Sequence, residues 1–399
     1  MFAPGVSVCF RWTGSDGVDA LSRMVDAIQN QDYPLSYINT TILVESTDRH
    51  LENLLQLAAK LNAAIVPYDR SDDHELVKER ALDIMPSDPV MMLGLGSSLD
   101  RQFVSEGARM LSQQPSVHIE KHHLFVQSTI RKRHQSSCCA VIPTSIPSLM
   151  PRVALAAQSV LLQEMDGRPD VLVAYSFKNL DEDAVDVFRI SMERKLPVLL
   201  HQHQHDVFPP ALARNIGARR VVDRPVVFVD ADMYLHPKTF EEALRLLNSE
   251  PCVVYVQPAM MHYVDETSDL FKDMTKEVFE ERSKDVGTAP GTGAVVFVTQ
   301  DVLAATHAYD ERFIGYGFTD WDFTNRLPAA GFKLFSLTQE TGIKAMHLPH
   351  PSRNETNPPS KTSEQIYSSE LGRNPQRNPD TWGGIPVNNF EDCGSLEKL

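Results

Sequence analysis

The sequence predicts an α/β protein in which strands and helices alternate along most of the chain. Short apolar segments rich in β-branched residues are separated by longer segments with helical periodicity. One apolar run, 226–229, ends abruptly in two carboxylates, Asp230 and Asp232. A second apolar run, 294–298, follows the glycine-rich segment 291–293. Such runs predict buried strands whose carboxyl ends lie at the edge of a sheet, where open α/β folds bind ligands.

The first third of the chain is expected to form one series of strands and helices. The expected elements are, in order, a strand from Val6, a helix over 21–28, a strand over 40–44, a helix over 51–61, a strand over 64–66, a further helix and a strand over 90–93.

The same order recurs from Cys138. The expected elements are a strand over 140–143, a helix over 153–162, a strand over 171–174, a helix over 184–193, a strand over 197–200, a helix over 212–219 and the strand over 226–229. With the two series in register, segment 93–96 falls opposite 229–232, so Gly94 and Gly96 stand where the second series has its carboxylates. We expect the first series to be a degenerate repeat of the second. The alternative is that any two βαβ series look alike because their spacing is shared.

The Asp-x-Asp pair at the end of the 226–229 strand is a candidate metal site. Carboxylate, water and phosphate oxygens are ligands that Mg²⁺ and Mn²⁺ accept, and a bound cation would neutralise a diphosphate. The alternative is a strand that runs into an Asx-rich turn before Pro237.

A second acid cluster lies farther along, in Gly315-Tyr316-Gly317-Phe318-Thr319-Asp320-Trp321-Asp322, and continues as Asn325-Arg326-Leu327. The two clusters in this order resemble the GT-A glycosyltransferases, especially the inverting family 2 enzymes and the β-1,4-galactosyltransferase group. The resemblance covers about residues 138–350. It implies a Rossmann-like GT-A fold that binds a nucleotide-diphosphate sugar.

The resemblance implies a role for each acid. Asp232 would coordinate the metal, and Asp230 would bind the ribose or a metal-bound water. Asp320, at the positive end of a helix, would be the general base, and Asp322 would hold the acceptor hydroxyls. The alternative for the second cluster is plain helix N-capping by Thr319 or Asp320.

Further residues match positions of the same family. His347 is the preferred third metal ligand, whereas His350 between two prolines is expected to be a loop residue. Arg214 is expected to pair with the diphosphate or with Asp230, and Asn215 to lie near the base or ribose. An amphipathic helix with one exposed arginine is the alternative for Arg214.

The remaining candidates concern the nucleotide and the acceptor. Thr144 and Ser145 would line the base or ribose, and Gly293 would lie at the acceptor side. Trp321 would stack on a sugar ring or pack under its loop. Trp321 stands where the family has an acidic residue, and Thr319 where it has Glu, so acceptor and donor specificity are open.

The resemblance implies a metal-dependent hexosyltransferase-like glycosyltransferase, using Mn²⁺ or Mg²⁺ and a UDP-sugar, that acts with inversion on a carbohydrate or another hydroxyl acceptor. A nucleotidyltransferase is an alternative, but segment 143–147 lacks a glycine-rich, basic phosphate loop. A non-catalytic scaffold that binds sugar nucleotides or carbohydrate is the other alternative.

Three boundaries follow from the two series. Residues 1–127 would be a degenerate GT-A-like domain without Asp-x-Asp, and 128–137 a polar, basic linker. Residues 138–350 would be the catalytic domain, and 351–399 a polar extension that forms a lid or is partly disordered.

The histidine-rich segment 201–205 follows an expected strand. Alternate side chains of a strand share a face, so a transition-metal site is conceivable. We favour a polar lining on the nucleotide side or a plain loop.

Composition limits the partners and the compartment. The formal net charge of −15 argues against nucleic acid as a partner. The five cysteines show no ligand spacing and no disulfide framework, which favours a reducing compartment. No apolar run is long enough to span a bilayer and the start does not read as a signal segment, so we expect a cytoplasmic protein. The sequence leaves homo-oligomerisation open.

Overall fold

The computed structural model describes most of both series of elements. The described residues are 6–12, 18–31, 38–45, 51–68, 72, 90–93, 99, 102–104, 116–119, 122–125, 138–145, 150–179, 182–221, 224–260, 293–315, 317–348, 361–370, 375–378 and 382. Gly94, Gly96, the predicted linker 128–137 and His350 lie outside them.

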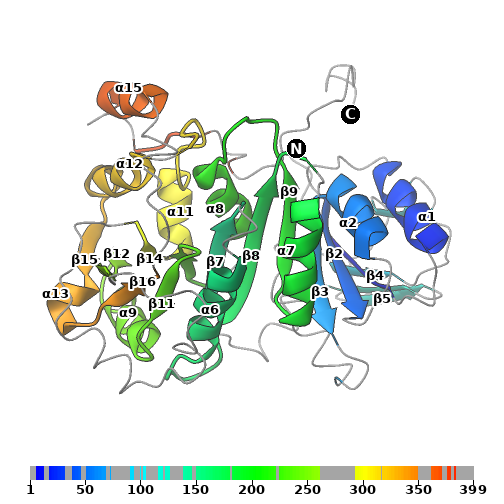
Figure 1. The fold of residues 1–399 in the computed structure, drawn as a ribbon, viewed down its shortest axis with the longest axis horizontal. Coiled ribbons are helices and arrows are strands. Elements are labelled where there is room, and N and C mark those ends of the chain that lie inside the picture. Colours follow the sequence, from blue (N-terminus) through cyan, green and yellow to red (C-terminus); the bar gives the residue numbers. More distant parts are fainter. Residues whose placement is uncertain are drawn as a thin grey trace.

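In the described part of the chain, one mixed sheet of thirteen strands runs through the molecule, as Figure 1 shows. Its strands are β1 (Val6–Trp12), β2 (Ile38–Glu45), β3 (Ala64–Tyr68), β4 (Val90–Leu93), β5 (Ser116–Ile119), β6 (His122–Phe125), β7 (Cys139–Thr144), β8 (Asp170–Phe177), β9 (Val198–Gln202), β10 (Val226–Val229), β12 (Cys252–Tyr255), β14 (Val295–Val298) and β15 (Lys333–Ser336). Their order across the sheet is β15-β12-β14-β10-β7-β8-β9-β3-β2-β1-β4-β6-β5. A separate small sheet joins β11 (Met233–Leu235), β16 (Ala345–His347) and β13 (Pro258–Met260). The predicted α/β fold is confirmed.

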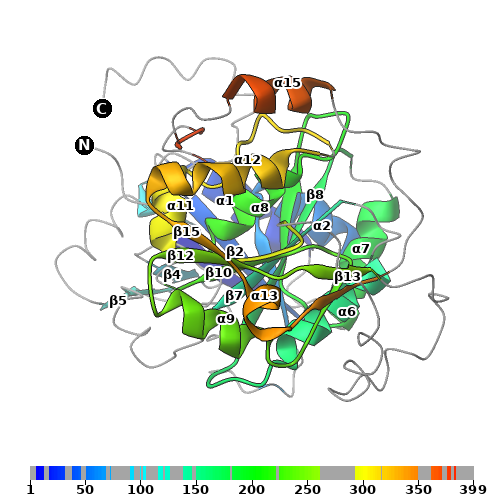
Figure 2. The same cartoon turned by 90° about the vertical axis from the view of Figure 1, so that its left-hand side faces the viewer.

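Helices cover both faces of the sheet, and their buried side chains form two apolar clusters. One cluster includes side chains of α1 (Val18–Gln29), α2 (Leu51–Lys60), α6 (Met150–Leu161), α7 (Glu182–Glu193), α9 (Thr239–Leu247) and α13 (Leu337–Thr341). The opposite cluster includes side chains of α8 (Pro210–Ala218), α11 (Gln300–Thr306) and α12 (Thr319–Arg326). A short 3₁₀ helix, η5 (Pro328–Ala330), follows α12, and α15 (Lys361–Glu370) lies over α12 in Figures 1 and 2.

The two halves of the sheet have the same strand order. In the first half the order is β3-β2-β1-β4-β6-β5, and in the second it is β9-β8-β7-β10-β14-β12, after which β15 adds a seventh strand parallel to β12. The senses agree as well: the first four strands of each half are mutually parallel, and the next two are antiparallel to their neighbours. The halves therefore share a topology as well as a sequence of elements.

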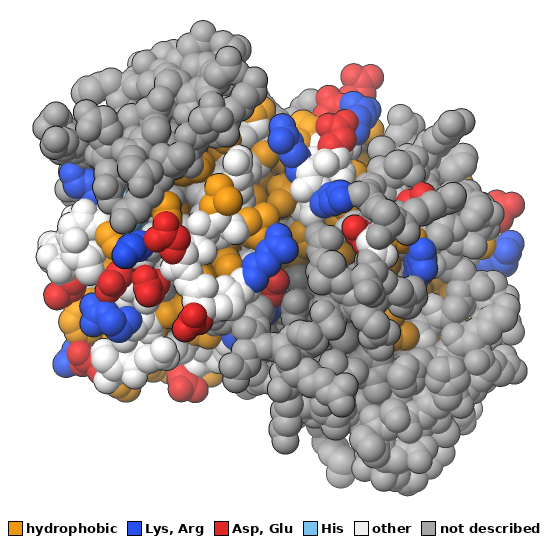
Figure 3. All heavy atoms as spheres, turned by 90° about the horizontal axis from the view of Figure 1, so that it is seen from below, with side chains coloured by type: hydrophobic (Ala, Val, Ile, Leu, Met, Phe, Trp, Pro, Cys, Tyr) orange, Lys and Arg blue, Asp and Glu red, His pale blue; other side chains and the backbone are white. Residues whose placement is uncertain are grey.

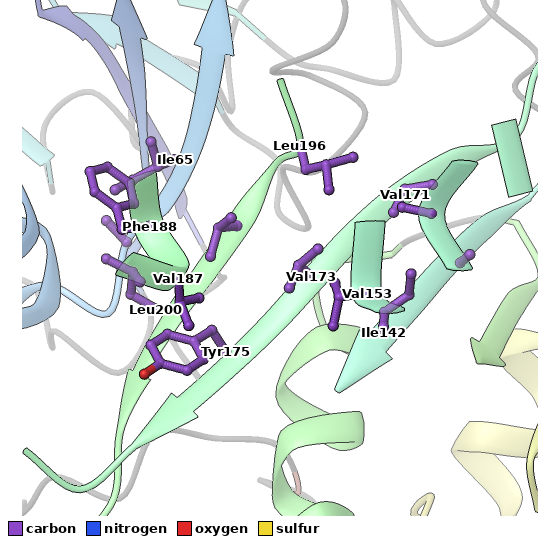
Figure 4. Packing of buried hydrophobic residues seen from close by; sticks show 14 of the residues in the cluster. Ile65, Ile142, Val153, Val171, Val173, Tyr175, Val187, Phe188, Leu196 and Leu200 are labelled. Atoms are coloured by element: carbon purple, nitrogen blue, oxygen red, sulfur yellow. The ribbon is translucent and has the colours of Figure 1, made fainter. Parts of the chain in front are cut away.

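The halves join edge to edge through an antiparallel pair, β3 with β9. When Val90 of β4 is matched with Val226 of β10, the strand registers place Ile65 where the second half has Val198. Ile65 and Val198 are also the residues that pair with each other across the junction. Figure 4 shows Ile65 and Phe188 of α7 in one group of buried apolar side chains beside this junction. Equivalent residues of the two halves therefore pair with each other at the junction, which gives it local two-fold symmetry. Apolar side chains cover it.

On the face shown in Figure 3, acidic and basic side chains of the described residues are interspersed. None of the helices in the described part is long and apolar enough to cross a membrane.

Candidate active site

The first part of the site forms where β10 ends and the chain turns into β11. The backbone N–H of Asp230 donates to the carbonyl of Ala294 at 2.8 Å, and Asp230 in turn accepts from the N–H of Met233 at 3.1 Å. The turn comes directly after the four buried residues of β10, and the strand ends where this apolar run ends. Asp230 and Asp232 are thereby held at the carboxyl end of the strand, as the sequence predicts.

The small sheet brings His347 to Asp232. Met233 of β11 pairs with His347 of β16, and the N–H of Leu348 donates to the backbone carbonyl of Asp232 at 2.7 Å. His347 Nε2 lies 3.6 Å from Asp232 Oδ2. Two of the three predicted metal ligands are therefore neighbours, although 115 residues separate them in the sequence.

The donor types of this pair suit a divalent cation. Imidazole nitrogen together with carboxylate oxygen fits Mn²⁺. Among the residues that the structure describes, no group of three or more His, Cys, Asp or Glu side chains is arranged around one point. Water and the phosphates of a substrate are further ligands that Mn²⁺ and Mg²⁺ accept.

Arg214 of α8 connects the two acid clusters. Its Nη2 donates to Asp230 Oδ1 at 2.6 Å, and its Nη1 donates to Asp320 Oδ1 at 3.1 Å. The guanidinium also lies 4.9 Å from the ring centroid of Tyr309. Only 5% of the arginine side chain is exposed, compared with 33% and 36% for the two carboxylates. Of the expected partners of Arg214, the structure shows Asp230, and the expectation of an exposed arginine is wrong.

The charges around Arg214 shift each other's pKa. Burial raises the pKa of Asp230, with Asp320 and Asp232 adding to the rise, while Arg214 opposes it. Burial alone would lower the pKa of Arg214, but Asp320 and Asp230 raise it above its usual value. Arg214 is therefore a permanent cation between two carboxylates.

The first turn of α12 carries Asp320. The residue at the N-cap is Phe318, in a left-handed conformation with φ of 65°, and no side chain caps the helix. The N-capping alternative for Thr319 and Asp320 is therefore wrong. The positive end of the helix favours a carboxylate in this turn.

Gly293 lies directly against Asp320. A Cβ atom added to Gly293 would come within 1.9 Å of Asp320 Cγ and 2.2 Å of its Oδ2. The carboxylate is thus placed by Arg214 on Oδ1 and by the bare Cα of Gly293 on the side of Oδ2. Gly293 is predicted to lie at the acceptor side. In the structure its lack of a side chain leaves the space that the Asp320 carboxylate occupies.

Asp322 faces away from Asp320, into the protein. It is buried, and its oxygens accept from Arg326 at 2.8 Å and from Arg377 at 3.5 Å. Burial raises the pKa of Asp322, while Arg326 and Arg377 lower it. The predicted contact of Asp322 with acceptor hydroxyls is therefore corrected: both oxygens belong to a buried ion network, and an i, i+4 position on α12 supplies one partner.

Asn215 is likewise engaged within the protein. Its amide nitrogen donates to the carbonyl of Tyr309 and to Glu311 Oε1, both at 2.8 Å, and its oxygen accepts from the N–H of Tyr309 at 3.1 Å. Asn215 is fully buried. The predicted place near base or ribose is corrected, because these bonds hold the 309–311 segment against α8.

Thr144 ends β7 and Ser145 follows it, at the same sheet edge as Asp230. Thr144 is 2% exposed, and its Oγ1 has no hydrogen-bond partner within the described part of the chain. A buried hydroxyl without a partner is expensive unless a ligand or water completes it. This is the arrangement that a nucleotide-binding residue would show.

The histidines at the end of β9 and just after it are packed together. His201 is 2% exposed, its Nδ1 lies 3.2 Å from Ser176 Oγ, and the rings of His201, His203 and His205 are spaced by 6.5 and 6.0 Å. Burial lowers the pKa of His201 to about 3, with His203 and His205 adding to the effect. His201 is therefore a neutral, structural histidine at neutral pH.

We expect this histidine to make stability fall at acid pH. The pKa of His201 is lower in the folded than in the unfolded chain, so the unfolded state binds the extra proton below about pH 6.5. The free energy of unfolding should drop by up to about 1.4 kcal/mol per pH unit from this group. Urea unfolding at pH 7.5 and 5 measures the slope, which His201→Gln should flatten. His205→Gln, in the same segment, should keep the wild-type slope, and an unchanged slope in His201→Gln would contradict this origin.

Residues beyond 351 contribute contacts that sequence reasoning missed. Asn378 Nδ2 donates to the carbonyls of His307 and Tyr309, Arg326 donates to the carbonyl of Pro375, and Arg219 lies 4.1 Å from the Trp382 ring centroid. Neither periodicity nor a motif marks these residues in a segment rich in Pro and Asn. The C-terminal extension is thus attached to α8 and α12 at the places described.

Comparison with known proteins agrees with this geometry. Residues 159–346 match the family described as glycosyltransferase like family 2. Over these residues the chain is similar to that family. The matched segment includes Arg214, both acid clusters and Gly293, and it ends one residue before His347. The predicted relation to the GT-A glycosyltransferases is confirmed at this level. No curated protein matches the chain.

Several solved structures resemble the domain at low identity. Staphylococcus aureus TarS residues 1–349 in complex with UDP has 14% identity and a TM-score of 0.37, and the match covers 54% of this chain and 61% of that one. The catalytic domain of Drosophila β1,4-galactosyltransferase 7 in complex with xylobiose has 10% identity and a TM-score of 0.37, over 62% of this chain and 82% of that one. The Pyrobaculum calidifontis mannosyltransferase PcManGT, in complex with GDP-Man and Mn²⁺, has 13% identity and a TM-score of 0.37, over 55% and 59%. The chain spans less than two thirds of the TarS fragment and of PcManGT, and the family assignment rests on residues 159–346.

Proposed function

We propose that the chain transfers a sugar from a nucleotide-diphosphate donor, a UDP-sugar, to an acceptor hydroxyl with inversion at the anomeric carbon. The observation that carries the proposal is the meeting of Asp232 and His347 at the same sheet edge as Asp320, from three separate segments. A metal-binding pair and a partly exposed carboxylate are the two elements that such a transfer requires. The family match of residues 159–346 supports the same reaction class.

Asp232 and His347 are the residues that would hold Mn²⁺ or Mg²⁺, which would neutralise the leaving diphosphate. Asp230 would approach the donor from beside them, with its other oxygen kept by Arg214. Thr144, with its unpartnered hydroxyl, and Ser145 would contact the ribose or base.

Asp320 would act as the general base. In this step the carboxylate takes the proton of the acceptor hydroxyl while the acceptor oxygen bonds to the anomeric carbon and the bond to the donor phosphate breaks. Its side chain is 36% exposed, so an acceptor can reach it, and Arg214 fixes its orientation through Oδ1. A single displacement of this kind inverts the anomeric centre.

The common strand order of the two halves supports a further part of the proposal. We assign residues 1–127 as a degenerate copy of the domain, joined to the functional copy through β3 and β9. Leu93 ends β4 as Val229 ends β10, and glycines at 94 and 96 follow in place of Asp230 and Asp232. The first copy would therefore not hold a metal.

A cytoplasmic location of the protein stays a prediction.

Thermal-shift titration with a panel of nucleotide diphosphates, each with and without Mn²⁺, tests the site. One nucleotide should stabilise the wild type by about 2.7 kcal/mol at a hundredfold excess over its Kd, only with metal, and Asp232→Ala should lose the effect. Asp320→Asn should keep the metal-dependent stabilisation while kcat falls by about 10² or more. Equal nucleotide binding in wild type and Asp232→Ala, or full turnover in Asp320→Asn, would refute the proposed roles.

A further inference from the structure

Three aromatic side chains gather at the start of α12, next to the proposed base. They are Phe318, Trp321 and Tyr367, which we call the aromatic wall. The Phe318 ring stacks on Tyr367 at 5.4 Å and meets Trp321 edge to face at 5.8 Å, and Trp321 lies 6.3 Å from Tyr367. The wall therefore combines α12 with α15, a helix of the C-terminal extension.

Trp321 is the exposed member of the wall. It is 55% exposed, and only Leu162 and Val207 among the other described residues are large apolar side chains with comparable exposure. Phe318 and Tyr367 are half-buried behind it. An indole held by two neighbouring rings yet left open to solvent is a large apolar surface ready for a partner.

Two features fix the wall in place. Asn325 Nδ2 donates to the Tyr367 hydroxyl at 2.6 Å, which ties α15 to α12. Phe318 adopts a φ of 65°, a left-handed conformation that is strained for a bulky residue. Such strain persists where the surrounding structure requires one particular side-chain position, and here it presents the ring to Tyr367.

Two residues of the aromatic wall are close neighbours of the proposed base in the sequence. Asp320 lies between Phe318 and Trp321 in the sequence and is 36% exposed, with its carboxylate held by Arg214 and Gly293. A molecule that rests on Trp321 would therefore have part of its structure within the neighbourhood of Asp320.

We infer that the aromatic wall binds the acceptor, that the acceptor is a carbohydrate, and that Tyr367 of α15 determines its affinity. A pyranose ring has a face of C–H groups that packs on an aromatic ring and hydroxyls at its rim, so it can cover Trp321 and still present an oxygen to Asp320. The polar rim of the wall, from the Asn325 amide and the Tyr367 hydroxyl, fits such a partner better than a purely apolar one. The inference rests on the proposed function for its reaction but makes a separate claim about binding.

Tryptophan fluorescence reads this surface directly. Of the three tryptophans, Trp12 and Trp382 are 0% and 7% exposed, so acrylamide quenching of the native protein reports mainly Trp321. The probes are methyl β-glucoside, methyl β-galactoside, cellobiose and lactose, each tested with Mn²⁺ and UDP present and absent. At least one saccharide should reduce the quenching constant by about half. In Tyr367→Ala, about ten times more of the same saccharide should be needed for the same reduction in quenching.

Turnover provides the second measurement. With the best saccharide as acceptor, Tyr367→Ala should raise the acceptor KM about tenfold, the value of one aromatic contact, while donor affinity and kcat stay close to wild type. Tyr367→Phe keeps the ring but loses the bond from Asn325, so its acceptor KM should rise by less than that of Tyr367→Ala. Leu162→Ala, an equally exposed apolar residue on another helix boundary, is the surface control.

The outcomes separate the inference from the proposed function. Quenching that no saccharide changes, in a protein that binds the nucleotide, overturns the inference and leaves the transferase proposal intact. An unaltered acceptor KM in a folded Tyr367→Ala protein overturns it too. Saccharide protection of Trp321 in a protein that binds no nucleotide supports the wall and refutes the proposed reaction.

Discussion

Replacing Gly293 with Ala should abolish most of the activity without unfolding the protein. The new Cβ would stand 1.9 Å from Asp320 Cγ, far inside any possible contact, so the Asp320 side chain must move. Movement breaks its bond to Arg214 and takes the carboxylate from its present position. A displacement of about 1 Å at a catalytic group costs about 10² in rate, so kcat should fall by at least that factor. Steady-state kinetics with saturating donor and acceptor measures it.

A second glycine gives a control with the opposite signature. Gly331 ends η5 with φ of 87° and has no atom within 4 Å of an added Cβ. Gly331→Ala should lower stability by about 1 kcal/mol through backbone strain and leave kcat unchanged. Gly293→Ala should keep the metal-dependent nucleotide binding of the wild type. Activity near the wild-type level in Gly293→Ala would show that Asp320 is not held where the structure has it, or that it is not the base.

The sequence allowed prediction of what depends on local pattern. A short apolar run predicts the strand that ends at Val229, and a short acidic run predicts the start of the helix that carries Asp320. Both elements are present in the structure. The alternation of strands and helices also follows from the order of apolar segments, and the mixed sheet with its covering helices has it. These features depend on residues within about one element of each other.

What the sequence could not provide is the choice of partner for each charged group. Asp320 and Asp322 are two positions apart on α12, yet one is open beside Gly293 and the other is enclosed by Arg326 and Arg377. On a helix, a step of two residues turns the side chain to the other face, and the tertiary packing decides which face is inside. Arg377 lies in a segment with no apolar periodicity, so no pattern in the sequence around it predicts its contact with Asp322. The acceptor role predicted for Asp322 was wrong for this reason.

The position of Arg214 illustrates the same limit. From sequence alone, a helix with one arginine among apolar residues is equally compatible with a surface position and with a buried one. In the structure, α8 is buried throughout from Ala211 to Ala218. Part of that burial comes from Gly217, whose missing Cβ lets α8 approach β7: an added Cβ would lie 2.3 Å from Val141 Cγ1. A close helix-to-sheet contact is therefore what carries the arginine inside, where it must find carboxylate partners.

Replacing Arg214 with Met should have the largest effect on stability. Methionine keeps the length of the side chain but leaves Asp230 and Asp320 facing each other without a cation. Breaking a fully buried ion pair by removing one partner costs about 3–5 kcal/mol, and the loss here should lie at or below the lower end of that range because the two carboxylates are 33% and 36% exposed. The free energy of unfolding from urea titration should fall by this amount at pH 8. Arg245→Met, which breaks the exposed pair with Glu242 on α9, should change it by less than about 0.5 kcal/mol.

The loss in Arg214→Met should shrink as the pH falls. Burial already raises the pKa of Asp230, and loss of the arginine removes the group that lowers it, so the folded state of the variant binds a proton more readily than the unfolded chain. A carboxyl whose folded pKa lies above its unfolded value destabilises the fold increasingly as the pH rises through that interval. The difference between wild type and variant should therefore be smaller at pH 5 than at pH 8. Because His201 titrates in both proteins, its contribution cancels in this difference.

A second substitution shows whether the lost energy belongs to the Arg214 and Asp230 pair. Adding Asp230→Asn to Arg214→Met removes one of the two uncompensated charges, so stability at pH 8 should recover in part and its pH dependence should flatten. A double variant less stable than Arg214→Met, or a loss that is the same at pH 5 and pH 8, would mean that Arg214 stabilises the fold by packing on Tyr309 and not by its charge. In that case the two acid clusters would be held in place independently, and the guanidinium would not be what orients Asp320.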